Sequence, residues 1–157
     1  MRPVLLPWPS NNLTTAVQGG SPIAELNAAR ATLGPCVYRA LHTHYAADEL
    51  LIVVSGRIEA LLLAPNHTVY KRTLEAGQNV VFPKGWNHYL YNPTCNQAHT
   101  HIFFNARYIG TINIPLNLAA AGPEYLRATY GRNPPQPQGL WVADSKCLER
   151  CQERRNA

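Results

Sequence analysis

Short β-rich runs separated by turn signals occupy the middle of this chain of 157 residues, from residue 37 to about residue 104. Turn-forming residues interrupt them at Ser55-Gly56, Pro65-Asn66, Ala76-Gly77, Pro83-Lys84-Gly85 and Asn92-Pro93. Several short strands at such spacing are typical of a β-sandwich or a β-barrel. The length suits one domain with one hydrophobic core and is short for two full domains. We therefore predict a single all-β domain.

The pattern changes beyond residue 115, where two segments have helical character. These are residues 116–130 and 143–155, separated by the proline-rich loop 133–139. The predicted organisation is one domain, with an N-terminal segment at 1–28, a barrel core at 29–114 and a helical extension at 115–157. The architecture is therefore an all-β barrel with a short α-helical C-terminal extension.

The composition excludes several classes of protein. No stretch approaches the ~18 consecutive apolar residues of a membrane-spanning helix. Charged residues make up 15% of the chain, below the ~25% usual for soluble domains, so disorder driven by charge is excluded. The net charge is +5, but the only basic cluster, at 150–155, alternates with glutamates and is typical of a solvated helix end. With no glycine-rich phosphate loop either, neither nucleic acid nor a membrane is an expected partner.

The four cysteines are an even number, which is compatible with two disulfides and an oxidising compartment. Two of them lie four residues apart on the predicted terminal helix and face the same side, which suits anchoring of that helix to the barrel. The four are Cys36, Cys95, Cys147 and Cys151. The pairing stays open among three connectivities, and the alternative is a cytosolic protein with four free thiols.

Two sequons, Asn12-Leu13-Thr14 and Asn66-His67-Thr68, could accept N-glycans. Prolines interrupt the apolar patch at the N-terminus before a signal-peptide core could form, so a secreted protein would have lost its leader. Together with the cysteines, these features favour an extracellular glycoprotein.

Two histidines, His42 and His44, flank one residue, so in a strand both imidazoles point to the same face. Glu49 follows His44 at an odd offset, which places it on the opposite face unless residues 45–48 bulge or turn. His88 follows the turn at 83–85 and can bring a fourth ligand across the barrel. Each histidine taken singly is more often an ordinary polar residue than a ligand, so the joint pattern carries the prediction of a metal site.

The spacing of these residues resembles the two characteristic motifs of the germin-like cupins. The motifs are His42-x-His44-x4-Glu49-x6-Gly56 and Gly77-x5-Pro83-x-Gly85-x2-His88-x3-Asn92. The resemblance covers residues 29–131 and implies a cupin jelly-roll β-barrel with one metal ion per chain, held by His42, His44, Glu49 and His88. Germins hold Mn(II), which makes manganese the implied ion. Three imidazoles and one carboxylate also suit Fe, Ni, Cu or Zn.

The segments around the cysteines resemble a narrower group, the secreted spherulin-type cupins of fungi and slime moulds. These segments are residues 33–36, 92–95 and 147–151. This second resemblance also implies a secreted protein.

Three positions depart from the oxalate-oxidising germins, in which two asparagines and a glutamine orient oxalate. This chain has Ala29, Arg39 and Leu90 at the matching positions. The hydrogen bonds that hold oxalate are therefore largely missing, and the comparison implies weak or no oxalate oxidase activity. Arg39 could still act as a catalytic residue by holding an anion in a bidentate contact. The alternative is that Arg39 is exposed and makes a surface salt bridge.

The resemblance implies a secreted, Mn-dependent oxidoreductase of germin type. The candidate reactions are superoxide dismutation, which needs only a redox-capable ion with an open site, and dioxygen-dependent oxidation of a small organic acid. The alternative is a non-enzymatic ligand-binding or structural protein, similar to auxin-binding or spherulin-type cupins. A second histidine pair, His99 and His101, could line the mouth of the barrel, although an outward orientation is the favoured interpretation.

The C-terminal extension has more apolar surface than a small closed barrel can bury, and exposed apolar patches usually mark interfaces. The residues concerned are Leu116, Leu118, Ala119, Tyr125 and Leu126. Germins assemble through barrel edges and helical extensions, so the resemblance implies a homo-oligomer. We expect a homodimer, and the alternative is a monomer in which these side chains fold back onto the barrel.

Overall fold

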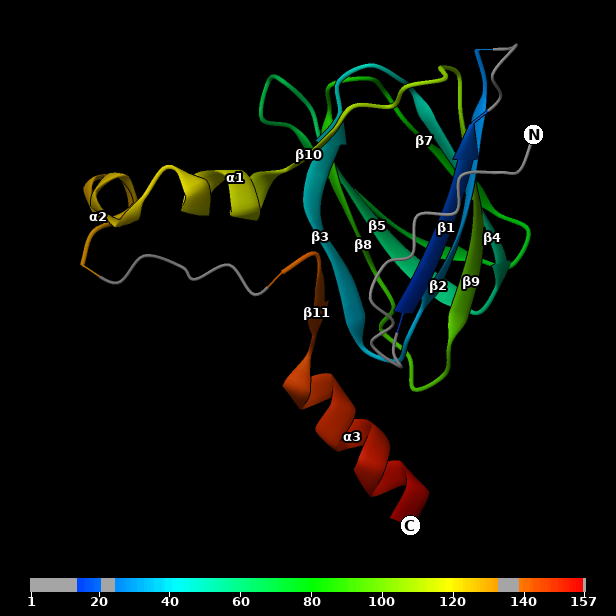
Figure 1. Cartoon of the computed structure of the whole chain (residues 1–157). Coiled ribbons are helices and arrows are strands. Elements are labelled where there is room, and N and C mark those ends of the chain that lie inside the picture. Colours follow the sequence, from blue (N-terminus) through cyan, green and yellow to red (C-terminus); the bar gives the residue numbers. More distant parts are fainter. Residues whose placement is uncertain (1–13, 21–24, 133–138, 157) are drawn as a thin grey trace.

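The structure, a computed structural model, describes residues 14–20, 25–132 and 139–156. Two antiparallel sheets face each other and enclose the core (Figure 1). The first sheet has the strand order β1 (Thr14–Gly20), β2 (Asn27–Leu33), β9 (Ala98–Phe104), β4 (Glu49–Ser55), β7 (Asn79–Phe82). The second has the order β10 (Thr111–Asn113), β3 (Val37–His44), β8 (Asn87–Tyr91), β5 (Arg57–Leu63), β6 (Val69–Glu75), and β11 (Trp141–Ala143) also pairs with β3. The predicted all-β barrel is confirmed.

The core lies between the sheets because the strands alternate buried and exposed side chains. In β9, every second residue from Ala98 to Phe104 is buried, while the residues between them face outward. The largest fully buried apolar side chains come from both sheets and include Leu33, Leu51, Ile58, Leu74 and Phe82. Burial of such side chains stabilises the fold by about 1.5–3 kcal/mol each.

Gly56 makes the tight turn between β4 and β5 possible. Its φ of +81° lies in the left-handed region, and a Cβ atom there would come within 2.8 Å of the Cα of Ala98. The turn can therefore pack directly against the start of β9.

The C-terminal extension differs in detail from the prediction. The helix expected at 116–130 is divided into α1 (Ile114–Ala120) and α2 (Pro123–Tyr130), because Gly122 adopts a φ of 95° and Pro123 starts a new helix. A strand that was not predicted, β11, precedes the terminal helix α3 (Ser145–Asn156). Likewise, β1 and the start of β2 lie in the segment predicted to precede the barrel core. Figure 1 shows α1 and α2 projecting from the barrel.

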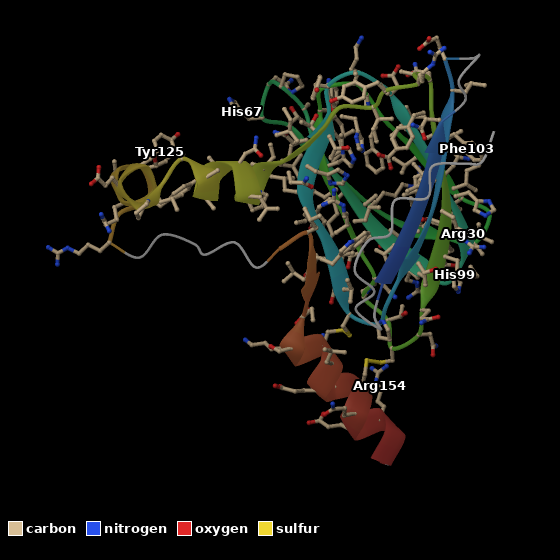
Figure 2. The ribbon with its side chains drawn as sticks, viewed as in Figure 1. Arg30, His67, His99, Phe103, Tyr125 and Arg154 are labelled. Atoms are coloured by element: carbon tan, nitrogen blue, oxygen red, sulfur yellow. A yellow bond between two sulfur atoms is a disulfide. The ribbon has the colours of Figure 1, made fainter. Side chains whose placement is uncertain are left out.

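Two disulfides connect α3 to the barrel (Figure 2). Cys36 pairs with Cys147 and Cys95 pairs with Cys151, which selects one of the three possible connectivities. The two predicted disulfides and the anchoring of the terminal helix are therefore present. Among the described residues, no helix is both long and apolar enough to span a membrane.

Candidate metal centre

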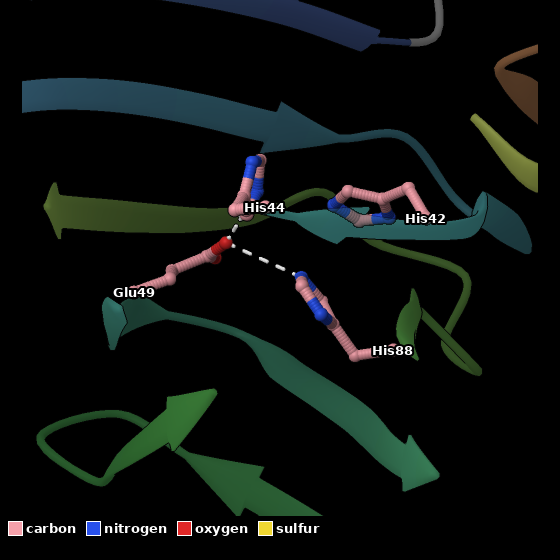
Figure 3. Close-up of side chains that lie close together, drawn as sticks. All are labelled: His42, His44, Glu49 and His88. Atoms are coloured by element: carbon pink, nitrogen blue, oxygen red, sulfur yellow. Dashed lines mark ion pairs between the residues drawn. The ribbon is translucent and has the colours of Figure 1, made fainter. Parts of the chain in front are cut away.

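Four side chains of the types that bind metals gather inside the barrel (Figure 3). They are the predicted ligands His42, His44, Glu49 and His88. One donor atom of each lies within 4.8 Å of the donor atoms of the other three. All four residues are buried, and the most exposed, His44, is only 6% exposed. The structure thus brings together a candidate metal-binding group.

Three strands supply these side chains. His42 and His44 lie on the same inward face of β3, as the alternation of a strand requires. His88 lies on β8, the neighbouring strand of the same sheet, directly opposite His42 in the register. Glu49, the first residue of β4, reaches the group from the other sheet. His88 was expected to reach the site from across the barrel. Instead, Glu49 does so, and His88 lies beside His42.

Residues 45–48 form the turn that the odd offset between His44 and Glu49 predicts. Asp48 fixes this turn: its N–H donates to Asn105 Oδ1 (2.9 Å), and its carboxylate accepts bonds from Asn105 Nδ2 (2.7 Å) and the N–H of Lys84 (2.8 Å). These bonds lower the pKa of Asp48, the one from Lys84 most strongly. The turn beside Glu49 is thus joined to two other loops, which fixes the direction from which Glu49 enters the site.

The three histidines have their Nδ1 atoms engaged, so their Nε2 atoms are left to face the centre. His42 Nδ1 lies 2.9 Å from the carbonyl oxygen of Ala40, and His88 Nδ1 lies 3.1 Å from that of Trp86. Because a carbonyl only accepts, both Nδ1 atoms carry the proton, and both Nε2 atoms offer a lone pair. His44 Nδ1 lies 3.0 Å from Thr111 Oγ1, a hydroxyl that can serve either tautomer.

Glu49 supplies the negative charge of the group. Its Oε2 lies 2.9 Å from His44 Nε2 and 3.3 Å from His88 Nε2 (Figure 3). Burial alone would raise the pKa of Glu49, but the interactions with these two imidazoles outweigh burial and hold the pKa well below its usual range. The carboxylate is therefore ionised at neutral pH.

The residues fit a divalent transition metal. Burial, reinforced by the charge of Arg39, lowers the pKa of His42 well below its usual value, so this imidazole is neutral at pH 7. His88 Nε2 is buried and makes no hydrogen bond with any of the described residues, although it lies 3.3 Å from Glu49 Oε2. A buried, unsatisfied ring nitrogen facing a carboxylate is well explained as a ligand position. Neutral imidazoles with one carboxylate suit Mn, Fe, Ni, Cu or Zn.

A cavity of about 140 Å³ opens beside the four side chains and is lined by three of them, His42, His44 and Glu49. Arg39 lines the same cavity, and its Nη2 donates to Asn113 Oδ1 at 2.8 Å. Burial lowers the pKa of Arg39 to about 10, so its guanidinium remains charged at neutral pH. The predicted alternative of an exposed, salt-bridging Arg39 does not hold, because the guanidinium is in the cavity wall.

The other two positions that depart from the oxalate-oxidising germins, Ala29 and Leu90, also line this cavity. The cavity wall includes residues that sequence analysis missed: Thr111, Asn113, Leu140 and Trp141. No local motif marks them, because they reach the site only through the pairing of β10 and β11 with β3.

The second histidine pair lies outside the site. His99 and His101 occupy the outward positions of β9, and His99 Nδ1 is 3.0 Å from Thr32 Oγ1. The favoured outward orientation is confirmed.

Comparisons with known proteins agree with the fold and the site. Residues 23–136 match the family described as Cupin. Germin-like protein 8-14 of Oryza sativa subsp. japonica is 46% identical over 68 residues, which are 43% of this chain and 32% of the relative. Auxin-binding protein ABP19b of Prunus persica is 42% identical over 67 residues, again 43% of this chain and 32% of the relative. The chain spans less than half the length of the curated relatives it matches.

Among solved structures, oxalate decarboxylase from Bacillus subtilis at pH 4.6 superposes with a TM-score of 0.78 at 15% sequence identity. The match covers 92% of this chain and 39% of that chain, and it shows a shared fold. With a family match over most of the described barrel, relatives among the germin-like proteins and a group of three histidines and one glutamate inside two facing sheets, the chain belongs to the cupin family and is a germin-like cupin.

Proposed function

We propose that this protein is a secreted, Mn-dependent oxidoreductase that oxidises a small carboxylic acid with dioxygen. The observation that carries the proposal is the position of Arg39, whose guanidinium lines the same cavity of about 140 Å³ as the candidate metal ligands. A cation beside a metal site provides a second point of attachment for a carboxylate. A cavity of this size favours a substrate of few carbon atoms.

The surroundings of Arg39 support an anionic ligand. Among the described residues, Arg39 forms no ion pair with a carboxylate. Its hydrogen bonds go to neutral oxygens, those of Asn113 and of the carbonyl groups of Ala40 and Leu140. A partly buried cation that has only neutral acceptors gains most from an anion entering the cavity.

A manganese ion bound by the four side chains would supply open coordination positions and a one-electron redox couple. The chain's own residues do the remaining work. Arg39 orients the carboxylate, and the apolar side chains of Leu90, Ile102 and Phe104 limit the access of water. Glu49 and the Nδ1 partners of the histidines fix the ligand geometry.

Arg39 also distinguishes this proposal from its competitors. Superoxide dismutation needs only a redox-active ion with an open coordination position. It has no carboxylate substrate that Arg39 could bind. The alternative is a protein that holds a carboxylate ligand without turning it over, and the auxin-binding protein of Prunus persica is named for binding rather than for catalysis. The similarity of fold to an oxalate decarboxylase supports a small carboxylate as the ligand class.

Secretion is supported by two observations. Both disulfides need an oxidising compartment to persist. Asn66 of the second sequon is exposed in the turn between β5 and β6, while Asn12 of the first lies outside the described residues.

The test is to load the protein with Mn(II) and measure oxygen consumption with oxalate, glyoxylate, malonate and lactate, and superoxide turnover in parallel. We expect oxygen consumption with at least one acid, and its loss in Arg39→Gln at unchanged metal content. Binding of an acid without oxygen consumption would instead support the ligand-binding alternative. Superoxide turnover that is unaffected by Arg39→Gln, with no acid consumed or bound, would contradict the proposed substrate class.

A further inference from the structure

The chain pairs with the same edge of β3 at two places, before and after the helical arm, which is defined here as α1 and α2, residues 114–130. On the departing side, β10 pairs Thr111–Asn113 with the stretch of β3 that carries His42 and His44. On the returning side, β11 pairs Trp141 with Arg39 and Ala143 with Val37. Figure 1 shows β11 beside β3, with α1 and α2 outside the barrel. One strand edge thus carries both the metal-site residues and the returning chain.

The returning chain forms part of the cavity wall. The carbonyl oxygen of Leu140 accepts hydrogen bonds from the N–H of Ala40 (2.8 Å) and from Arg39 Nη1 (3.4 Å). Trp141 lies directly opposite Arg39 in the register and therefore shares its inward face. The guanidinium carbon is 5.4 Å from the centroid of the indole ring, within cation–π range. Trp141 also packs against the hydrophobic core, and both Leu140 and Trp141 line the cavity.

Covalent links hold this part of the wall. β11 has only three residues, at the short end of the usual range for strands, so its own ladder contributes few hydrogen bonds. Directly after it, the N–H of Asp144 donates to the carbonyl oxygen of Cys36 (2.7 Å), and Cys36 is bonded to Cys147. The second disulfide, Cys95–Cys151, lies one helical turn further along α3. The position of Trp141 therefore depends most directly on the first disulfide.

We propose that Trp141 is a specificity-determining residue, whose indole forms the wall that limits the cavity to short carboxylates, and that the Cys36–Cys147 disulfide holds it in place. This inference rests on the proposed function, since it assumes that the cavity beside Arg39 takes a carboxylate. The indole lies within cation–π range of the same guanidinium that would bind the acid and lines the cavity beside it, so it both orients Arg39 and limits the space for a longer chain. Shortening Trp141 opens that space, and longer acids then fit.

The test measures binding rather than turnover. Mn(II)-loaded wild type, Trp141→Ala and Trp141→Phe are titrated with oxalate, malonate, succinate and glutarate by calorimetry, with metal content measured for each variant. In the wild type, affinity falls as the acid lengthens. In Trp141→Ala, the affinity ratio of glutarate to oxalate rises by about tenfold or more, since one methylene in a pocket discriminates by at least that factor. Trp141→Phe restores most of the wild-type ratio. An unchanged ratio in Trp141→Ala would overturn the inference.

Paired cysteine variants test the role of the disulfide. Cys36→Ser/Cys147→Ser frees β11 and should shift the length preference in the same direction as Trp141→Ala. Cys95→Ser/Cys151→Ser is the matched control, because it removes a disulfide further from β11 and should shift the preference less. Equal, wild-type preferences in both double variants would show that the disulfide does not hold the wall.

A separate measurement distinguishes failure of this inference from failure of the proposed function. If none of the four acids binds to the wild type, the proposed function fails. The wall is then tested by water-proton relaxation of the Mn(II)-loaded protein, which reports solvent access to the ion without any acid. Relaxation should rise in Trp141→Ala and in Cys36→Ser/Cys147→Ser, and an unchanged value in both would overturn the inference.

Discussion

Arg39 donates a hydrogen bond of 2.8 Å from Nη2 to Oδ1 of Asn113, a residue 74 positions further along the chain. Asn113 is the last residue of β10 and directly precedes α1, while Nη1 of the same guanidinium reaches the carbonyl oxygen of Leu140, where the chain returns. A single side chain in the cavity thus contacts both the residue that precedes α1 and the residue that precedes β11. The arm is connected to the candidate site even though its helices lie outside the barrel.

The first prediction concerns this guanidinium. Arg39→Gln removes the charge while keeping polar atoms. It should weaken carboxylate binding by roughly 10- to 100-fold, because a hydrogen bond to a charged group contributes about 1.5–3 kcal/mol. Asn113→Ala leaves the charge in place and should weaken binding less. Calorimetric titration of the Mn(II)-loaded variants with oxalate measures both effects. Equal affinities in the wild type and Arg39→Gln would show that Arg39 does not hold the acid.

The second prediction is that the protein has weak or no oxalate oxidase activity. Ala29 and Leu90 line the cavity and present only apolar groups, so of the three positions that depart from the oxalate-oxidising germins only Arg39 can still bond to oxalate. Peroxide release from oxalate by the Mn(II)-loaded protein is the measurement. A double variant, Ala29→Asn/Leu90→Gln, restores two of the missing polar groups and should raise the rate. Robust peroxide release by the wild type would mean that Arg39 compensates for the missing groups.

The sequence predicted the parts of the site that depend on local spacing. The alternation in β3 requires His42 and His44 to share a face, and the odd offset of Glu49 requires the turn at 45–48, which the structure has. The four cysteines predicted two disulfides, and both are present. These inferences succeeded because each rests on the geometry of a single strand or a simple count.

The parts of the fold and of the site that form by contacts between distant segments could not be predicted from one sequence. The pairing of Trp141 with Arg39 joins residues from the barrel and the C-terminal extension, and nothing around Trp141 marks it as a strand. The break between α1 and α2 follows from the φ of Gly122, although the Gly122-Pro123 pair could have indicated it. His88 was expected across the barrel, and its place beside His42 follows from the strand order, which local patterns do not encode.

The third prediction concerns pH. The N–H of Cys147 and the hydroxyl of Tyr91 donate to the carboxylate of Asp144 and lower its pKa, the bond from Cys147 more strongly. Because the pKa in the folded protein lies below the value of about 3.9 for an unfolded aspartate, the ionised form stabilises the folded state above about pH 4, and this contribution is lost as the pH falls further. Denaturant titrations at pH 7 and pH 3, with the disulfides intact, should show a smaller loss of stability on acidification in Asp144→Asn. The same loss in both proteins would contradict this role.

The fourth prediction concerns assembly. Leu116 is 39% exposed and Tyr125 is 49% exposed on helices that project from the barrel (Figure 1), which supports the proposal of a homodimer. Light scattering should give about twice the chain mass of 17.4 kDa at micromolar concentration. Tyr125→Glu should shift the equilibrium toward monomer, whereas Tyr70→Glu, at an exposed position on β6, should not. A mass near 17.4 kDa across a wide concentration range would establish a monomer.

The metal site is the central claim, and its most direct test is elemental analysis of protein purified after exposure to Mn(II). The wild type should hold one transition-metal ion per chain, and His88→Ala should hold little, because it removes the buried nitrogen that has no hydrogen-bond partner in the part of the chain that the structure describes. Because the metal ion binds only the folded state, its loss should also lower the free energy of unfolding. The decrease should be about 2.7 kcal/mol where the metal is present at 100 times its dissociation constant. His99→Ala, on the outer face of β9, is the matched control and should retain the ion. Full occupancy in a combined His42→Ala, His44→Ala and His88→Ala variant would contradict the assignment.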